Sequence, residues 1–201
     1  IQKRPFKIQH LYRRDTMKPL VIFGTGELAE CVHYYLSNDS GHKIVAFTQD
    51  RHYMKNSTYK GLPVIPFDEA HKMFPPEHFD MFIAIGYQNL NDIRTQKYNE
   101  AKNKGYKLIS YVSTKSTFWN DLNIGENCFI TENNVIRPFV NLGNNIFIWS
   151  GGMIGHHSSI GDNCFICSHV VIGGGTMIEE NCFLGINSTI DQYVKIARNC
   201  I

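Results

Sequence analysis

The sequence has little of what marks a membrane protein or a nucleic-acid-binding protein. No run of apolar residues approaches the length that a bilayer-spanning helix needs. The 20 basic and 18 acidic residues leave a formal net charge of only +2, and they are scattered along the chain. Because no cationic patch is indicated, we expect no nucleic-acid partner, no membrane association and a cytoplasmic location.

The sequence has only six cysteines in 201 residues, a number that could still suggest disulfides or a metal site, so their spacing has to be examined. Four of the cysteines follow one another at spacings of 36, 18 and 18 residues, namely Cys128, Cys164, Cys182 and Cys200. This regularity indicates a structural repeat. We therefore predict that these four are buried, free cysteines that pack in a core, since disulfides are disfavoured in the cytosol.

The first part of the chain alternates short apolar runs with helical patterns, which predicts an α/β domain over residues 17–112. Apolar runs that separate helices are typical of a parallel sheet with helices on its faces. Residues 1–16 form an extension of unknown role. The predicted strands are 19–23, 44–47, 62–65, 81–85 and 108–112, and the predicted helices are 28–36, 67–74 and 93–104.

The second part, residues 113–201, has a different period. From Phe118 to Ile196 every sixth residue is Phe, Ile or Leu, without a slip. A period of six fits neither an α-helix nor an alternating strand, and self-similarity at a fixed period is typical of a solenoid.

Six of these hexads begin with an aliphatic residue followed by glycine, a pattern that resembles the hexapeptide repeat of the left-handed β-helix acyltransferases. The pairs are Ile124-Gly125, Leu142-Gly143, Ile154-Gly155, Ile160-Gly161, Ile172-Gly173 and Leu184-Gly185. The resemblance implies a left-handed parallel β-helix with 18 residues in each triangular coil and the first residue of each hexad pointing inward.

From Met17 onward the chain resembles the PglD/NeuD-like sugar N-acetyltransferases, which have a small Rossmann-like domain before the β-helix. The resemblance implies a homotrimer that transfers acetyl from acetyl-CoA to a UDP- or dTDP-linked amino-dideoxy sugar, such as a 4-amino-4,6-dideoxyhexose. It also implies that the α/β domain binds the nucleotide sugar and the β-helix binds acetyl-CoA. Two alternatives stay open: O-acylation of a sugar, and a non-catalytic β-helix scaffold with a nucleotide-sugar sensor domain.

The segment 151–162 matches the catalytic stretch of that family, and the match makes His156 the general base. An imidazole is suited to removing the proton of an attacking amine. The family has an acidic residue directly after this histidine, and His157 takes that place here. In an 18-residue coil Gly174 lies above His156, so we expect its N–H to stabilise the developing oxyanion.

Further contacts with acetyl-CoA are expected from Gly173, Ile190 and Lys195. No metal is expected, because His156, His157 and His169 lack a recognised ligand spacing. Cys167 is not expected to act as an acylated nucleophile, because no adjacent base and acidic partner are evident.

A glycine turn, Gly24-Thr25-Gly26-Glu27, follows the first predicted strand and opens a helix, where a phosphate can bind. Glu30 stands in place of the third glycine of a dinucleotide fingerprint, which favours a nucleotide sugar over NAD. The other substrate contacts that we predict are Asp50 to the base or ribose, Gly86 and Tyr87 to the nucleotide or hexose, Arg94 to a phosphate, and His169 to the substrate of a neighbouring subunit.

Overall fold

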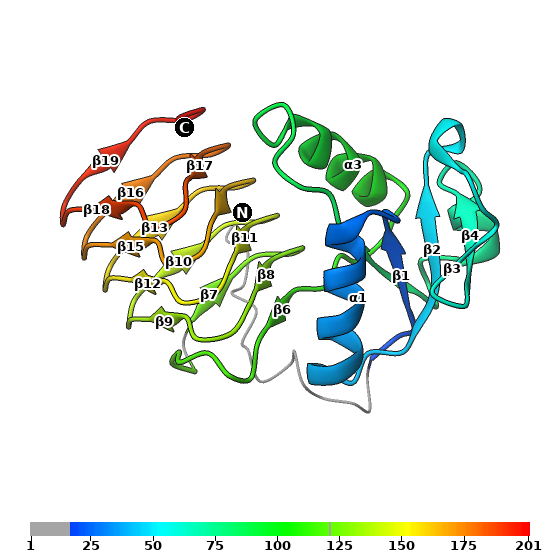
Figure 1. Ribbon diagram of the computed structural model, residues 1–201, viewed down its shortest axis with the longest axis horizontal. Coiled ribbons are helices and arrows are strands. Elements are labelled where there is room, and N and C mark those ends of the chain that lie inside the picture. The colour runs from blue at the N-terminus through cyan, green and yellow to red at the C-terminus, as the bar shows by residue number, and fades with distance from the viewer. Residues whose placement is uncertain (1–16, 121) are drawn as a thin grey trace.

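The computed structural model describes residues 17–120 and 122–201, which form two domains packed side by side (Figure 1). The predicted extension 1–16 lies outside the described residues. The α/β domain has a five-stranded sheet in the order β3-β4-β2-β1-β5, in which only β3 is antiparallel to its neighbour. Its strands are β1 (Leu20–Phe23), β2 (Ile44–Gln49), β3 (Thr58–Tyr59), β4 (Leu62–Pro66) and β5 (Asp80–Ile83). Its helices are α1 (Glu27–Asp39), the short 3-10 helix η3 (Arg51–Tyr53), α2 (Ala70–Met73) and α3 (Asp92–Asn103).

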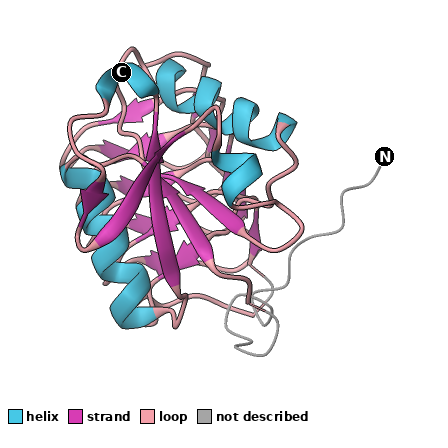
Figure 2. Cartoon of the chain, turned by 90° about the vertical axis from the view of Figure 1, so that its right-hand side faces the viewer, coloured by secondary structure: helices cyan, strands magenta, loops and turns pink. Residues whose placement is uncertain are grey.

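The sheet is covered on both faces, as its unbroken apolar strands predict. Alternate residues of β1 point to opposite faces: Leu20 and Ile22 pack with α1, whereas Val21 and Phe23 pack with α2 and α3. Figure 1 shows α1 between the sheet and the second domain, and Figure 2 looks onto the sheet from its other side.

The second domain is the expected left-handed parallel β-helix, built of two-residue strands on three faces. Face 1 consists of β7 (Asn123–Ile124), β10 (Asn141–Leu142), β13 (Ser159–Ile160), β16 (Met177–Ile178) and β19 (Lys195–Ile196). Face 2 consists of β6 (Tyr111–Val112), β8 (Phe129–Ile130), β11 (Phe147–Ile148), β14 (Phe165–Ile166) and β17 (Phe183–Leu184). Face 3 consists of β9 (Val135–Ile136), β12 (Met153–Ile154), β15 (Val171–Ile172) and β18 (Thr189–Ile190).

The register of the faces confirms a coil of 18 residues, since Leu142 pairs with Ile160 and Ile124 on the same face. The first residue of the hexads points inward and is buried from Ile124 to Leu184. Cys128, Cys164 and Cys182 are fully buried in the same core and free, as predicted, and Cys200 packs against it from the last coil.

From Asn127 onward, each corner of the coil contains a residue with positive φ, which lets the backbone turn between faces. Between faces 1 and 2 these residues are all asparagine, the type that tolerates this conformation best after glycine: Asn127, Asn145, Asn163, Asn181 and Asn199. Between faces 2 and 3 they are Asn133, Gly151, His169 and Asn187. Between faces 3 and 1 they are Phe139, His157, Gly175 and Tyr193.

The strand predicted over 108–112 is divided between the two domains. Leu108 forms an isolated bridge with Met81 of the α/β sheet, whereas Tyr111 and Val112 pair with β8 on face 2 of the β-helix. The prediction of one strand closing the first sheet is therefore wrong. An apolar run shows that a segment is buried, but not which sheet it joins.

None of the helices in the described part of the chain is long and apolar enough to cross a membrane.

Candidate active site

The two adjacent histidines lie at the corner between faces 3 and 1, which we call the histidine corner (residues 137–140, 155–158, 173–176 and 191–194). His157 has φ 59°, so the chain turns between the two residues. Both side chains are exposed, and their Nδ1 atoms are 3.1 Å apart. One ring can therefore donate a hydrogen bond to the other and fix its tautomer and orientation. The Phe139 ring packs against His157 with centroids 4.7 Å apart.

Gly174 lies directly against His156 in the next coil, as the sequence spacing predicts. A Cβ atom at Gly174 would stand 2.9 Å from both Cε1 and Nε2 of His156. The backbone N–H groups of Gly173 and Gly175 are paired with Ile190 and His156 carbonyls. The N–H of Gly174 has no hydrogen-bond partner among the described residues, so it is available to a ligand beside the imidazole.

The glycine run 173–175 leaves the backbone of this corner uncovered. A Cβ atom at Gly173 would stand 2.4 Å from the Gln192 backbone nitrogen. One at Gly175 would stand 2.5 Å from the Tyr193 ring, and φ 69° disfavours other residues there as well. Any side chain in this run would displace a neighbour and close the surface next to His156.

The other residues predicted at the β-helix site lie elsewhere. Ile190 is half-buried and packs against the core, so the cofactor contact predicted for it stays a prediction. Lys195 is exposed on face 1, with its Nζ 2.8 Å from Glu179 Oε1. His169 lies at the corner between faces 2 and 3, where a Cβ atom at Gly151 would meet its ring at 2.6 Å. Within one chain, His169 is thus not part of the histidine corner.

A second site lies at the carboxyl ends of the α/β strands. From β1 the strand order runs outward through β2 to β4, and β5 lies on the other side of β1. The strand order therefore reverses direction at β1. Ligands of open parallel sheets bind at such a switch point. Gly24, with φ 116°, allows the close approach of the two strand ends, because a Cβ atom there would stand 2.8 Å from the Ala84 oxygen.

A cavity of about 940 Å³ opens at this switch point, and we call it the seam cavity because both domains line it. The α/β domain contributes Gly26, Glu27, Leu28, Cys31, Ala84, Ile85, Gly86, Tyr87 and Gln88. The β-helix contributes Trp149, Phe165, Cys167, Ser168, Phe183, Gly185 and Ile186. The wall is largely aromatic and aliphatic, with Glu27 as its one carboxylate and no lysine or arginine among these residues.

Cys167 is thus a wall residue of the seam cavity. Burial raises the pKa of its thiol, which favours the less nucleophilic protonated form.

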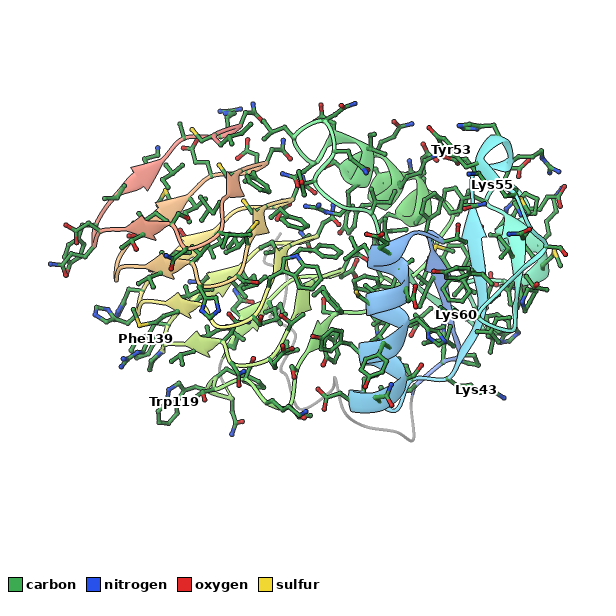
Figure 3. All side chains as sticks on the ribbon, viewed as in Figure 1. Lys43, Tyr53, Lys55, Lys60, Trp119 and Phe139 are labelled. Atoms are coloured by element: carbon green, nitrogen blue, oxygen red, sulfur yellow. The ribbon has the colours of Figure 1, made fainter. Side chains whose placement is uncertain are left out.

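A smaller cavity of about 330 Å³ adjoins the same glycine turn, between β2 and the segment after it. Its polar lining includes Thr25, Gln49, Tyr53 and Lys55. Gln49 accepts a hydrogen bond from the Thr25 hydroxyl and donates one to the Tyr53 carbonyl at 3.0 Å. Figure 3 labels Tyr53 and Lys55 at this end of the α/β domain.

Asp50, predicted to contact the base or ribose, lies outside the smaller cavity. Its carboxylate accepts a hydrogen bond from Lys97 Nζ at 2.8 Å and does not line the cavity, whereas its neighbour Gln49 does. Sequence reasoning missed Gln49 because strand ends are uncertain by a residue or two. A polar residue at the end of an apolar strand was the available signal.

The prediction that Arg94 meets a phosphate is wrong. Its side chain is fully buried, and its guanidinium donates to backbone carbonyls of both domains. A charged residue on a polar helix resembles a solvated one in sequence, and only the docking of the β-helix buries it.

No three His, Cys, Asp or Glu side chains gather as a metal site within residues 17–120 and 122–201.

The comparisons with known proteins agree with this architecture. Residues 19–101 match the model of the PglD N-terminal domain. The sequence resemblance is thereby confirmed for the α/β domain. No curated protein sequence matches the chain.

Solved structures extend the likeness over both domains. A variant of perosamine N-acetyltransferase from Caulobacter crescentus, in complex with CoA and GDP-perosamine, superposes with a TM-score of 0.72 and 18% identity, covering 91% of this chain and 93% of that one. The acetyltransferase domain of PglB from Neisseria gonorrhoeae FA1090 gives a TM-score of 0.58 and 20% identity, covering 87% and 96%. At these identities the likeness establishes a shared fold, a PglD N-terminal domain followed by a β-helix.

Proposed function

We propose that the protein transfers an acetyl group from acetyl-CoA to the amino group of a nucleotide-linked amino-dideoxy sugar. The observation that carries this proposal is the contact between the exposed His156 ring and Gly174, whose N–H is free among the described residues. A base and an oxyanion donor side by side are what acyl transfer to an amine needs. The perosamine N-acetyltransferase of the same fold, which was solved with CoA and GDP-perosamine, supports it.

His156 acts as the general base in this proposal. It accepts the proton of the substrate amine as the new C–N bond forms, and the Gly174 N–H donates to the acyl oxygen as negative charge develops there. His156 then returns the proton to the departing sulfur as the C–S bond breaks. His157 orients the His156 ring through the contact between their Nδ1 atoms.

The glycine run fits the acyl donor. Acetyl-CoA supplies an acetyl group that is already activated as a thioester. Gly173, Gly174 and Gly175 expose backbone beside the base where any Cβ atom would clash, so a narrow chain can lie against them.

The nucleotide sugar is proposed to lie across the switch point of the α/β sheet. Its diphosphate meets the glycine turn at Gly24 to Gly26, its base enters the smaller cavity beside Gln49, and its hexose enters the seam cavity. Aromatic residues such as Tyr87 and Trp149 offer apolar faces to a deoxyhexose. The nucleotide is proposed to be UDP or dTDP, and GDP is the rival that the perosamine enzyme suggests.

We propose a homotrimer, and the placement of the two sites supports an active site shared between chains. The seam cavity borders face 2, whereas the histidine corner joins faces 3 and 1 on the opposite side of the same coil. Figure 3 labels Phe139, which packs against His157, at the end of the molecule far from the α/β domain. In this proposal the sugar bound in one chain meets the histidine corner of another. A fully active monomer in sedimentation would contradict this.

The direct test is incubation with acetyl-CoA and 4-amino-4,6-dideoxyhexoses linked to UDP, dTDP or GDP, with release of CoA thiol as the readout. We expect turnover with one nucleotide series and a product whose acetyl group resists mild alkali, as an amide does and an ester does not. If no member of the panel releases thiol above the hydrolysis background, the proposed function is wrong.

A further inference from the structure

Arg94 of α3 is a buried cation at the seam between the two domains. Its side chain has no exposed surface and no carboxylate within hydrogen-bond distance. Instead, Nη1 donates to the Gly86 carbonyl at 2.9 Å, and Nη2 donates to the Asn163 carbonyl at 2.8 Å. The guanidinium also lies 4.9 Å from the centroid of the Phe147 ring.

A buried, unpaired cation is a poor way to stabilise a fold. Burial lowers the pKa of Arg94 to about 9, and its Nε has no hydrogen-bond partner among the described residues. An apolar side chain of similar length often serves a core as well as a buried charge, or better. The arrangement therefore points to a geometric task, because a guanidinium can reach several carbonyls at once in a fixed fork.

The loop between β5 and α3, residues 84–91, has an unusual backbone that needs support. Asn89, Leu90 and Asn91 have φ values of 48°, 49° and 69°, three consecutive residues in the left-handed region. Such a run of non-glycine residues persists only where its surroundings hold it. The loop also carries Gly86, Tyr87 and Gln88, which line the seam cavity.

The contacts that hold this loop come from the β-helix. Asn91 is buried, and its Nδ2 donates to the Cys182 carbonyl at 3.4 Å. The Tyr87 ring packs on the Phe183 ring with centroids 4.7 Å apart and on the Phe165 ring at 5.1 Å. Arg94 joins the Gly86 carbonyl at one end of the loop to the carbonyls of the corner between faces 1 and 2.

We infer that Arg94 is a positioning residue for the sugar nucleotide, fastening the 84–91 loop to the β-helix so that Tyr87 is held over the seam cavity before the substrate arrives. The inference rests on the proposed function only in naming the ligand of that cavity. The β-helix thus shapes the nucleotide-sugar site of its own chain besides supplying the histidine corner. Loss of Arg94 should weaken sugar binding and leave the glycine run and His156 unaffected.

The test compares Arg94→Met with Arg94→Lys, and with Gln96→Ala as the matched control on the exposed side of α3. Three measurements are made on the full chain. The first is hydrogen exchange of residues 86–91 without ligand. The second is a titration with the nucleotide sugar of the panel that gives the highest turnover. Binding is detected through the fluorescence of Trp149, and Trp119→Phe removes the signal of the other tryptophan. The third is the pair of KM values for sugar nucleotide and acetyl-CoA.

For Arg94→Met we expect faster exchange in the loop, a rise of about tenfold in Kd and KM for the sugar nucleotide, and a KM for acetyl-CoA within about twofold of wild type. Arg94→Lys should show a smaller defect than Arg94→Met. Gln96→Ala should give wild-type values in all three measurements. Equal changes in both KM values, or exchange that accelerates across the whole chain, would reveal a general folding defect and overturn the inference.

Unchanged loop exchange and unchanged sugar binding in Arg94→Met would overturn it as well. These outcomes are separable from failure of the proposed function. If wild type transfers no acetyl group, the exchange and fluorescence measurements still decide whether Arg94 shapes the cavity.

Discussion

His156 and Gly174 are in contact across one coil of the β-helix, and a methyl group on Gly174 would stand 2.9 Å from the imidazole. Gly174→Ala should therefore displace the ring and cover the free N–H. We expect kcat to fall about 100-fold, the scale of losing an oxyanion donor, while the sugar nucleotide still binds in the seam cavity. Steady-state kinetics and the Trp149 titration check this. Normal turnover in Gly174→Ala would show that neither the contact nor the N–H takes part.

The two histidines of the corner should differ in their effect on turnover. His156→Ala removes the proposed base and should lower kcat about 100-fold or more. His157→Ala removes only the orienting contact between Nδ1 atoms and should cost less, below about tenfold. His71→Ala, an exposed histidine on α2, is the control. If His157→Ala were the severe variant and His156→Ala nearly normal, His157 would be the base.

Two inactive variants should restore each other's activity if the sites are shared between chains. Gly185 lines the seam cavity, and a Cβ atom there meets nothing within 4 Å, so Gly185→Trp can fill the cavity without straining the backbone. Mixed trimers of Gly185→Trp and His156→Ala chains should regain about a quarter of wild-type activity, the random fraction of interfaces with one intact pocket and one intact base. Mixed trimers that stay inactive would place both halves of the site in one chain.

Asp39, at the end of α1, should make the docking of the two domains sensitive to acid. It accepts hydrogen bonds from Tyr111 Oη at 2.6 Å, Ser113 Oγ at 3.0 Å and the Thr114 backbone at 2.9 Å. Partial burial acts to raise the pKa of Asp39, but the hydrogen bonds from Thr114, Tyr111 and Ser113 outweigh it, and the pKa is lowered.

Because the folded-state pKa of Asp39 lies below the unfolded value, its stabilisation is complete above about pH 4 and is lost as the pH falls through the folded value. Asp39→Asn should lower the free energy of unfolding by about 1 to 3 kcal/mol at pH 7, and the difference should shrink toward pH 3. Urea unfolding at both pH values measures this, with the exposed Asp68→Asn as control. If the difference in unfolding free energy between wild type and Asp39→Asn grew on acidification, the pKa of Asp39 would be raised on folding and not lowered.

The β-helix and the pairing within its histidine corner can be predicted from the residue pattern alone. A coil of fixed length repeats the same local geometry, so the strict period of six is enough to bring Gly174 next to His156 and to align Cys164 with Cys182. The unbroken apolar run of β1 and the glycine turn after it likewise predict a buried parallel strand with a ligand site at its end.

The contacts between the two domains, by contrast, cannot be predicted from the residue pattern and are seen only in the folded chain. Arg94 resembles a solvated residue in the sequence, but the β-helix packs on α3 and buries it. The same packing pairs Tyr111 with face 2 and makes Trp149 and Phe183 walls of the seam cavity. These contacts join residues far apart in the chain across two unlike surfaces. No period relates those surfaces, so no pattern in the sequence could place one against the other.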